Sequence, residues 1–114
     1  MIDPSEAPFT IEGRQLIAET PDVCVQILTL GRGEEVPWHF HTEVTDTIAC
    51  LDGPMVVKIR DAAESNELQA GEIVTVPPKP PHQVAGKDGG PCRFMVVQGV
   101  GKYDFVKLAR RSDE

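Results

Sequence analysis

Residues 33–46 read GEEVPWHFHTEVTD and hold two of the chain's three histidines, His39 and His41. Asp46 follows five positions after His41, and Gly53 completes the spacing G-x5-H-x-H-x4-D-x6-G. On a β-strand, residues two apart point to the same face and lie roughly 6.6 Å apart along the chain. If this segment is a strand, both imidazoles can bind one metal ion from the same face.

The third histidine, His82, ends a second stretch with the spacing G-x5-P-x4-H, from Gly71 through Pro77. Seventeen residues, 54–70, separate the two stretches. An H-x-H pair alone is weak evidence for a metal site, because exposed histidines are common on protein surfaces. A barrel can place the short strand next to His82 beside or across from the first histidines, which strengthens the prediction.

Short apolar runs recur along the chain, and several alternate apolar with polar residues. No window of eleven or more residues keeps a helical pattern without a Gly or Pro interruption. Turn residues separate the runs, and the chain has ten Gly and ten Pro. This organisation predicts an all-β sandwich or barrel with few or no helices. The expected strands are Val23–Leu28, Thr47–Leu51, Met55–Arg60, Ile73–Val76 and Cys92–Val100.

The chain length of 114 residues predicts one domain, residues 1–114, with a core of about residues 11–108. The ends, residues 1–10 and 109–114, are polar or Pro-rich and are expected to be loosely ordered. The three cysteines are isolated and lie in apolar runs, so buried thiols are expected. The formal net charge of -7 disfavours binding to nucleic acid or to an anionic membrane surface. The start lacks a secretory pattern, and no apolar run is long enough to span a membrane, so a cytoplasmic location is expected.

The two histidine stretches resemble the motifs of the cupin superfamily, G-x5-H-x-H-x3,4-E-x6-G and G-x5-P-x-G-x2-H-x3-N. All three histidines fall on the histidine positions of that family, and the positions of Gly33, Gly53, Gly71 and Pro77 also match. The resemblance implies a small single-domain cupin-type β-barrel, also called a double-stranded β-helix or jelly roll. It also implies a divalent transition metal held by His39, His41, His82 and a carboxylate. Imidazole ligands suit Fe, Mn, Ni, Cu or Zn alike.

Three positions depart from the motifs: Asp46 replaces Glu, Lys79 replaces Gly, and Gly86 replaces Asn. Asp is one methylene shorter than Glu, and metal–oxygen bonds need about 2.0–2.2 Å. Asp46 is therefore expected to bind the metal directly, to bind it through a water, to support a ligand imidazole, or only to line the pocket. Glu43 is the alternative carboxylate. Three-histidine sites also occur in the superfamily, so the metal prediction does not depend on Asp46.

The substrate pocket is expected to have an apolar wall and two inward amides. The residues predicted to line it are Gln26, Ile48, Cys50, Met55, Phe94 and Gln98. Trp38 and Phe40 alternate with the ligand histidines, so they are expected to face away from the metal. Tyr103 lies in the tail of the chain and is assigned no role.

Three functions remain open, and no catalytic residue is assigned. The favoured one is a metal-dependent oxygenase or isomerase acting on a small organic acid or carbonyl compound. The second is a non-catalytic module that binds or senses a small molecule, with a weak or lapsed metal site. The third is a metal-free sugar-modifying cupin with a histidine base, which the apolar strand faces disfavour. The expected partners are a small-molecule ligand and a second copy in a homodimer, with no nucleic acid and no membrane.

Overall fold

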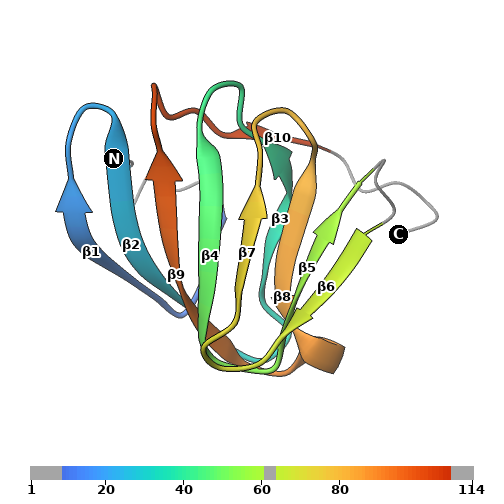
Figure 1. The fold of residues 1–114 in the computed structure, drawn as a ribbon. Coiled ribbons are helices and arrows are strands. Elements are labelled where there is room, and N and C mark those ends of the chain that lie inside the picture. Colours follow the sequence, from blue (N-terminus) through green and yellow to red (C-terminus); the bar gives the residue numbers. More distant parts are fainter. Residues whose placement is uncertain (1–8, 61–63, 109–114) are drawn as a thin grey trace.

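Two five-stranded antiparallel sheets face each other in the computed structural model, which describes residues 9–60 and 64–108 (Figure 1). One sheet has the order β1-β2-β9-β4-β7, and the other has the order β10-β3-β8-β5-β6. The strands are β1 (Gly13–Glu19), β2 (Val23–Leu30), β3 (Glu35–Phe40), β4 (Thr45–Asp52), β5 (Met55–Ile59), β6 (Glu64–Leu68), β7 (Ile73–Val76), β8 (His82–Gly86), β9 (Cys92–Gly99) and β10 (Val106–Lys107). The only helical element among these residues is a 3-10 turn, η2 (Lys87–Gly89). The predicted all-β jelly-roll fold is confirmed.

Strict alternation along the central strands builds the core between the sheets. In β2 and β9 every second side chain is buried, and the two strands pair antiparallel over their whole length. The buried apolar residues from both sheets form one cluster that includes Leu30, Met55 and Phe94. The predicted last strand is one residue too long, because β9 ends at Gly99 and Val100 is 77% exposed.

Strands β1, β6 and β10 escaped the sequence prediction because they lack an apolar alternation. Strand β1 is mostly exposed at the edge of its sheet, β6 reads Glu-Ser-Asn-Glu-Leu, and β10 has two residues. All three are edge strands that gain their structure from pairing with a neighbour. In the described part of the chain, no helix is long and apolar enough to cross a membrane.

The two ends differ in how far the structure describes them. The expectation of loose ordering falls on residues 1–8 and 109–114, which lie outside the described residues. Phe9 is described and packs against Phe105, with ring centroids 5.5 Å apart. The three cysteines are free and buried, as predicted.

A β-bulge in β3 determines which side chains reach the barrel interior. Val36 pairs with Val84 and His39 pairs with His82, so β3 spans one residue more than β8 between these pairs. The extra residue turns the strand, and Val36 and His39 both face inward although they are three positions apart. Trp38 faces away from the interior, where the guanidinium of Arg60 lies 4.7 Å from its ring centre.

The departures at Lys79 and Gly86 have separate physical explanations. Lys79 has a φ of 91°, the backbone conformation that favours glycine, and its N–H donates to the carbonyl of His41 at 2.8 Å. The chain thus keeps the glycine-like backbone without the glycine. At Gly86, a Cβ atom would lie 1.7 Å from the carbonyl oxygen of Gly90. No side chain fits there, so asparagine could not replace Gly86 without moving the turn.

We predict that Lys79→Gly stabilises the protein. A residue with a Cβ in the left-handed region costs about 1–2 kcal/mol, and glycine removes most of that cost. Chemical denaturation should show a gain of about 1 kcal/mol in the free energy of unfolding. Lys79→Ala is the matched control, because it removes the same side chain but keeps the Cβ, and it should give no gain. Equal stability of the two variants would mean that the backbone at this position is not strained.

Candidate metal centre

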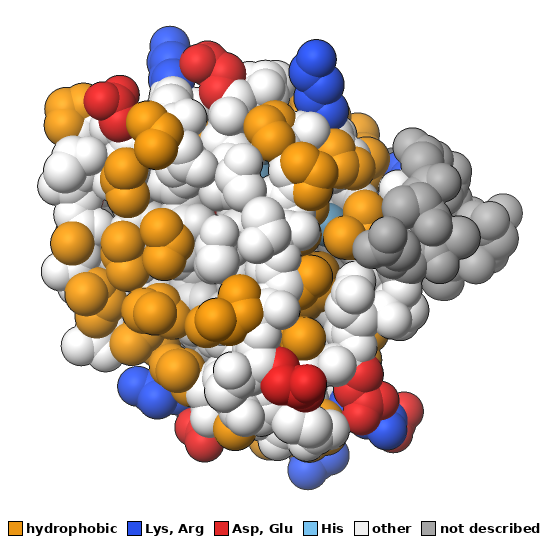
Figure 2. Space-filling view, in the orientation of Figure 1, with side chains coloured by type: hydrophobic (Ala, Val, Ile, Leu, Met, Phe, Trp, Pro, Cys, Tyr) orange, Lys and Arg blue, Asp and Glu red, His pale blue; other side chains and the backbone are white. Residues whose placement is uncertain are grey.

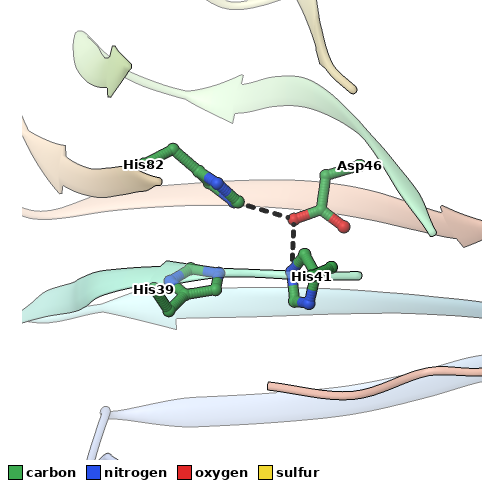
Figure 3. Close-up of side chains that lie close together, drawn as sticks. All are labelled: His39, His41, Asp46 and His82. Carbon is green, nitrogen blue, oxygen red and sulfur yellow. Dashed lines mark hydrogen bonds and ion pairs between the residues drawn. The ribbon is translucent and has the colours of Figure 1, made fainter. Parts of the chain in front are cut away.

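Four buried polar side chains converge between the two sheets (Figure 3). Strand β3 carries His39, and His41 follows directly after that strand. Asp46 lies on β4 and His82 begins β8. One ligand atom from each of the four lies within 4.8 Å of all the others. The histidines come from one sheet and the carboxylate from the other, so the centre joins the two sheets.

Backbone carbonyls orient all three imidazoles. The Nδ1 of His39 lies 2.7 Å from the carbonyl oxygen of Pro37, and that of His82 lies 3.4 Å from that of Pro80. The Nδ1 of His41 bonds the carbonyl of Asp104. A carbonyl only accepts, so each Nδ1 carries a hydrogen, and in the neutral imidazole each Nε2 then offers a lone pair. This is the orientation that metal-binding histidines usually have.

The carboxylate of Asp46 faces two of these lone pairs. Its Oδ2 lies 3.1 Å from Nε2 of His41 and 3.0 Å from Nε2 of His82. Its Oδ1 is buried and has no hydrogen-bond partner. An acceptor oxygen cannot rest against two nitrogen lone pairs unless a proton or a metal ion lies between them. The donor set, three imidazole nitrogens and one carboxylate, therefore fits a cation and could bind a metal ion.

The pKa values of the cluster follow from burial and from these contacts. Burial raises the pKa of Asp46, but its contacts with His41 and His82 outweigh that effect and hold the pKa well below its usual range. Burial lowers the pKa of His41, but the contact with Asp46 outweighs it and the pKa is raised. Burial and the charge of His82 lower the pKa of His39 to about 3, so this imidazole is neutral at pH 7.

The choice between Asp46 and Glu43 as the nearby carboxylate has a geometric answer. Asp46 is buried within hydrogen-bonding distance of two imidazoles, so the shorter side chain reaches the cluster. Glu43 is exposed and lies outside it. Asp46 reaches the two imidazoles because β4 lies across the interior of the barrel from the histidines.

The segment after β9 positions two of the histidines, which the sequence reasoning missed. The carboxylate of Asp104 accepts hydrogen bonds from the backbone N–H of Thr42 at 2.9 Å and from its hydroxyl at 2.8 Å. The ring of Phe105 stacks on His39, with centroids 4.1 Å apart and planes 11° apart. Tyr103, to which no role was assigned, lines the cavity. The only signal was the alternation of two aromatic residues around an aspartate.

A cavity of about 30 Å³ adjoins the cluster, enough for about two waters. Four of the six predicted pocket residues line it: Gln26, Ile48, Phe94 and Gln98. Cys50 and Met55 also face inward but lie in the hydrophobic core and not at this cavity. Alternation along a strand places a side chain inside the barrel but does not say at which depth. The other polar lining includes Arg14, which the sequence reasoning did not consider.

Comparison with known proteins places this geometry in a family. The model of the cupin domain family matches residues 26–98. A double-stranded β-helix protein from Klebsiella pneumoniae is 24% identical, with a TM-score of 0.73, and the alignment covers 85% of this chain and 84% of that one. The polyketide cyclase RemF from Streptomyces resistomycificus is also 24% identical, with a TM-score of 0.67 and coverages of 82% and 66%.

A third structure, an oxalate oxidase, is 17% identical with a TM-score of 0.65, and the alignment covers 76% of this chain and 46% of that one. Likeness at these identities shows the fold alone. The search of curated proteins finds no match.

We predict a stability window for the metal-free protein that depends on Asp46. The pKa of Asp46 is lower in the folded state than in the unfolded chain, where it is about 3.9. Asp46 therefore stabilises the fold at pH values above about 3.9, and this contribution is lost as the pH falls through the folded pKa. The pKa of His41 is higher in the folded state than in the unfolded chain, where it is about 6.5. His41 therefore stabilises the fold at pH values below about 6.5, and this contribution is lost as the pH rises through the folded pKa.

Both contributions are complete only between about pH 4 and pH 6.5. The melting temperature of the chelator-treated wild type should exceed that of chelator-treated Asp46→Asn by the largest amount inside that pH window. Glu43→Gln removes an exposed carboxylate and should melt like the wild type at each pH. Parallel pH profiles for the wild type and Asp46→Asn would contradict the proposed charge pair.

Proposed function

The chain belongs to the cupin domain family, and from this premise we propose that it is a metal-dependent enzyme, an oxygenase or an isomerase. Its metal ligands would be His39, His41, His82 and Asp46, and its substrate a small organic acid or carbonyl compound. The single observation that supports this most is the Asp46 carboxylate, buried against two imidazole nitrogens with one oxygen unpartnered. A divalent ion would satisfy all of these groups at once.

The donor set limits the metal to Fe, Mn, Ni, Cu or Zn, since imidazole suits all five. Three or four protein ligands leave positions for water, dioxygen or substrate. Once bound, such a metal supplies a Lewis acid and, if it is iron, oxygen chemistry. The chain itself holds each Nε2 toward the interior through the Nδ1 contacts, and Phe105 shields His39 from water.

The relatives leave the reaction class to experiment. One solved structure with this fold is a polyketide cyclase and another is an oxalate oxidase. One name thus denotes a cyclisation and the other an oxidation. The identity of the metal would narrow the choice for this chain, because zinc, which has no redox chemistry, would exclude an oxygenase, whereas the other candidates leave both classes open.

The third function, a metal-free sugar-modifying cupin, needs a histidine with a free basic nitrogen. The Nε2 atoms of His41 and His82 both contact Asp46, and the Nδ1 atoms of both contact carbonyls. His39 does not contact Asp46, but its pKa of about 3 makes it a poor base near neutral pH. The arrangement therefore favours a metal over a histidine base. The small cavity favours the binding or sensing module as the second candidate, and metal content separates the two.

We predict that untagged protein, purified without chelator, carries close to one transition metal per chain. Mass spectrometry of the metal would identify it. His82→Ala should lose the metal and melt at a lower temperature, because bound metal stabilises the folded state. Asp46→Asn should weaken metal binding about 10-fold or more, by analogy with removal of a partner from a metal site.

Glu43→Gln is the matched control for Asp46→Asn and should keep both metal and Tm. Protein that contains no metal and takes up none of the five ions would favour the non-catalytic module. Unchanged metal content in His82→Ala would show that the ligand assignment is wrong.

The homodimer and the cytoplasmic location stay predictions. The outer face of the first sheet carries Val23, Val25 and Ile27 on β2 and Met95 and Val97 on β9, all half-buried. Hydrophobic side chains gather over these strands on the surface (Figure 2). A second copy offers the same apolar surface, so a two-fold contact between these faces would be self-complementary.

We predict that Ile27→Lys converts a dimer to a monomer, because a lysine buried between two copies lacks a partner. Light scattering after gel filtration would measure the mass. Lys58→Glu, on the exposed side of β5 in the other sheet, is the control and should keep the wild-type mass. A monomeric wild type would contradict the proposed interface.

A further inference from the structure

Arg14 is the only lysine or arginine among the described residues that line the metal cavity. It lies on β1, paired with Leu28, whose side chain belongs to the core. The position is therefore on the inner face of the sheet, and the side chain is partly buried. An arginine on the inner face of a barrel sheet needs a reason, because charged residues usually face water.

The contacts of Arg14 with other described residues do not neutralise its charge. Its Cζ lies 4.4 Å from the ring centre of Phe9, and its Nη2 donates to the carbonyl of Phe9 at 3.4 Å. No carboxylate among the described residues forms an ion pair with it. Burial lowers the pKa of its guanidinium, so the charge is partly removed from water with no carboxylate beside it among the described residues.

A diagonal line of polar side chains connects Arg14 with the metal centre across the first sheet. Asp46 pairs with Gln98 on β9. Gln98 pairs with Cys24 on β2, two residues from Gln26. Gln26 pairs with Leu16 on β1, two residues from Arg14. All these positions share the inner face of the sheet, because side chains alternate with a period of two.

The two amides on this line are buried, with exposures of 4% for Gln26 and 6% for Gln98. The Nε2 of Gln26 donates to Oε1 of Gln98 at 3.4 Å, a long bond, and Oε1 of Gln26 has no partner. A buried amide oxygen without a donor is costly, and a ligand hydroxyl or a water can satisfy it. The line thus offers a cation at one end and polar groups along its length.

We propose that Arg14 is the substrate anchor: it binds the carboxylate of a small organic acid whose second oxygen donor reaches the metal held by the histidine cluster. This inference rests on the proposed function and decides between its two substrate classes in favour of the acid over the neutral carbonyl compound. Three strand spacings of about 4.8 Å and a displacement of four residues, about 13 Å, along the strands put the backbone of Arg14 roughly 20 Å from that of Asp46, and the long arginine side chain spans part of this distance. The remaining distance suits an acid of a few carbon atoms.

Phe9 occupies the position that the carboxylate would take. Its ring covers the guanidinium and lies 5.5 Å from the ring of Phe105, which covers His39. The cavity of about 30 Å³ is too small for a dicarboxylate while both rings stay in place. Binding therefore exchanges the contact between Arg14 and Phe9 for an ion pair between Arg14 and the ligand.

The test is calorimetric titration of metal-loaded protein with paired probes. Malonate, succinate and glutarate each carry one carboxylate for the metal and one for Arg14, whereas malonamate, succinamate and glutaramate replace the second carboxylate by a neutral amide. The wild type should bind the best dicarboxylate at least about 10-fold more tightly than its monoamide, because charge-assisted bonds to arginine are the strong ones. Arg14→Gln should reduce this preference to less than about 2-fold.

Arg14→Lys keeps the charge and the aliphatic stem but loses the planar fork, so it should keep part of the preference. This variant keeps the test decisive if Arg14→Gln folds poorly. Arg93→Gln, an equal charge change on β9, is the control and should bind like the wild type. Metal content is measured for every variant and should not change.

The outcomes separate the anchor from the metal site. Metal-dependent binding that is equally tight in Arg14→Gln overturns the anchor and leaves the metal site standing. Binding that needs Arg14 but is unaffected by removal of the metal supports the anchor and contradicts the proposed function. No preference for any dicarboxylate in the metal-loaded wild type also overturns the anchor.

Discussion

The buried carboxylate of Asp46 is the constraint on which this structure depends. It comes from one sheet and meets imidazoles from the other, with its two close Nε2 contacts at 3.0 and 3.1 Å. Burying an unpaired carboxylate costs several kcal/mol or more, so positive charge must accompany it. Either a proton on His41 or a metal ion supplies that charge. The two sheets therefore meet at a point where a metal ion would compete with protons for the same lone pairs.

The H-x-H spacing predicted that His39 and His41 share one face of a strand, and the structure adds a reason for their inward orientation that spacing cannot show. The bulge in β3 shifts the alternation so that His39 faces inward together with Val36. Without the extra residue, the inward face would carry Trp38 instead. The local sequence holds no mark of the bulge except Pro37, whose missing N–H is compatible with an interrupted ladder. The fold and the convergence of the three histidines were thus predictable, whereas the bulge that orients His39 was not.

The rest of the site escaped prediction because it depends on contacts between distant segments. Arg14 and Tyr103 lie in stretches without apolar alternation, and only the pairing of β1 with β2 and of β10 with β3 brings their segments to the cavity. Cys50 and Met55 show a different limit, because both face inward but lie in the core below the cavity. The alternation of side chains along a strand shows which face a residue occupies. Its depth inside the barrel depends on tertiary packing.

The charge distribution constrains how an acid could reach such a site. The chain carries a formal net charge of -7, so its outer field repels anions and cannot speed their arrival. Inside the barrel the sign would reverse once a divalent metal is bound, because Arg14 and the metal together would outweigh the single carboxylate of Asp46. This short-range attraction acts where water is scarce and screening is weak. Selectivity for an acid would thus arise after entry, from the cavity itself, and not from long-range steering.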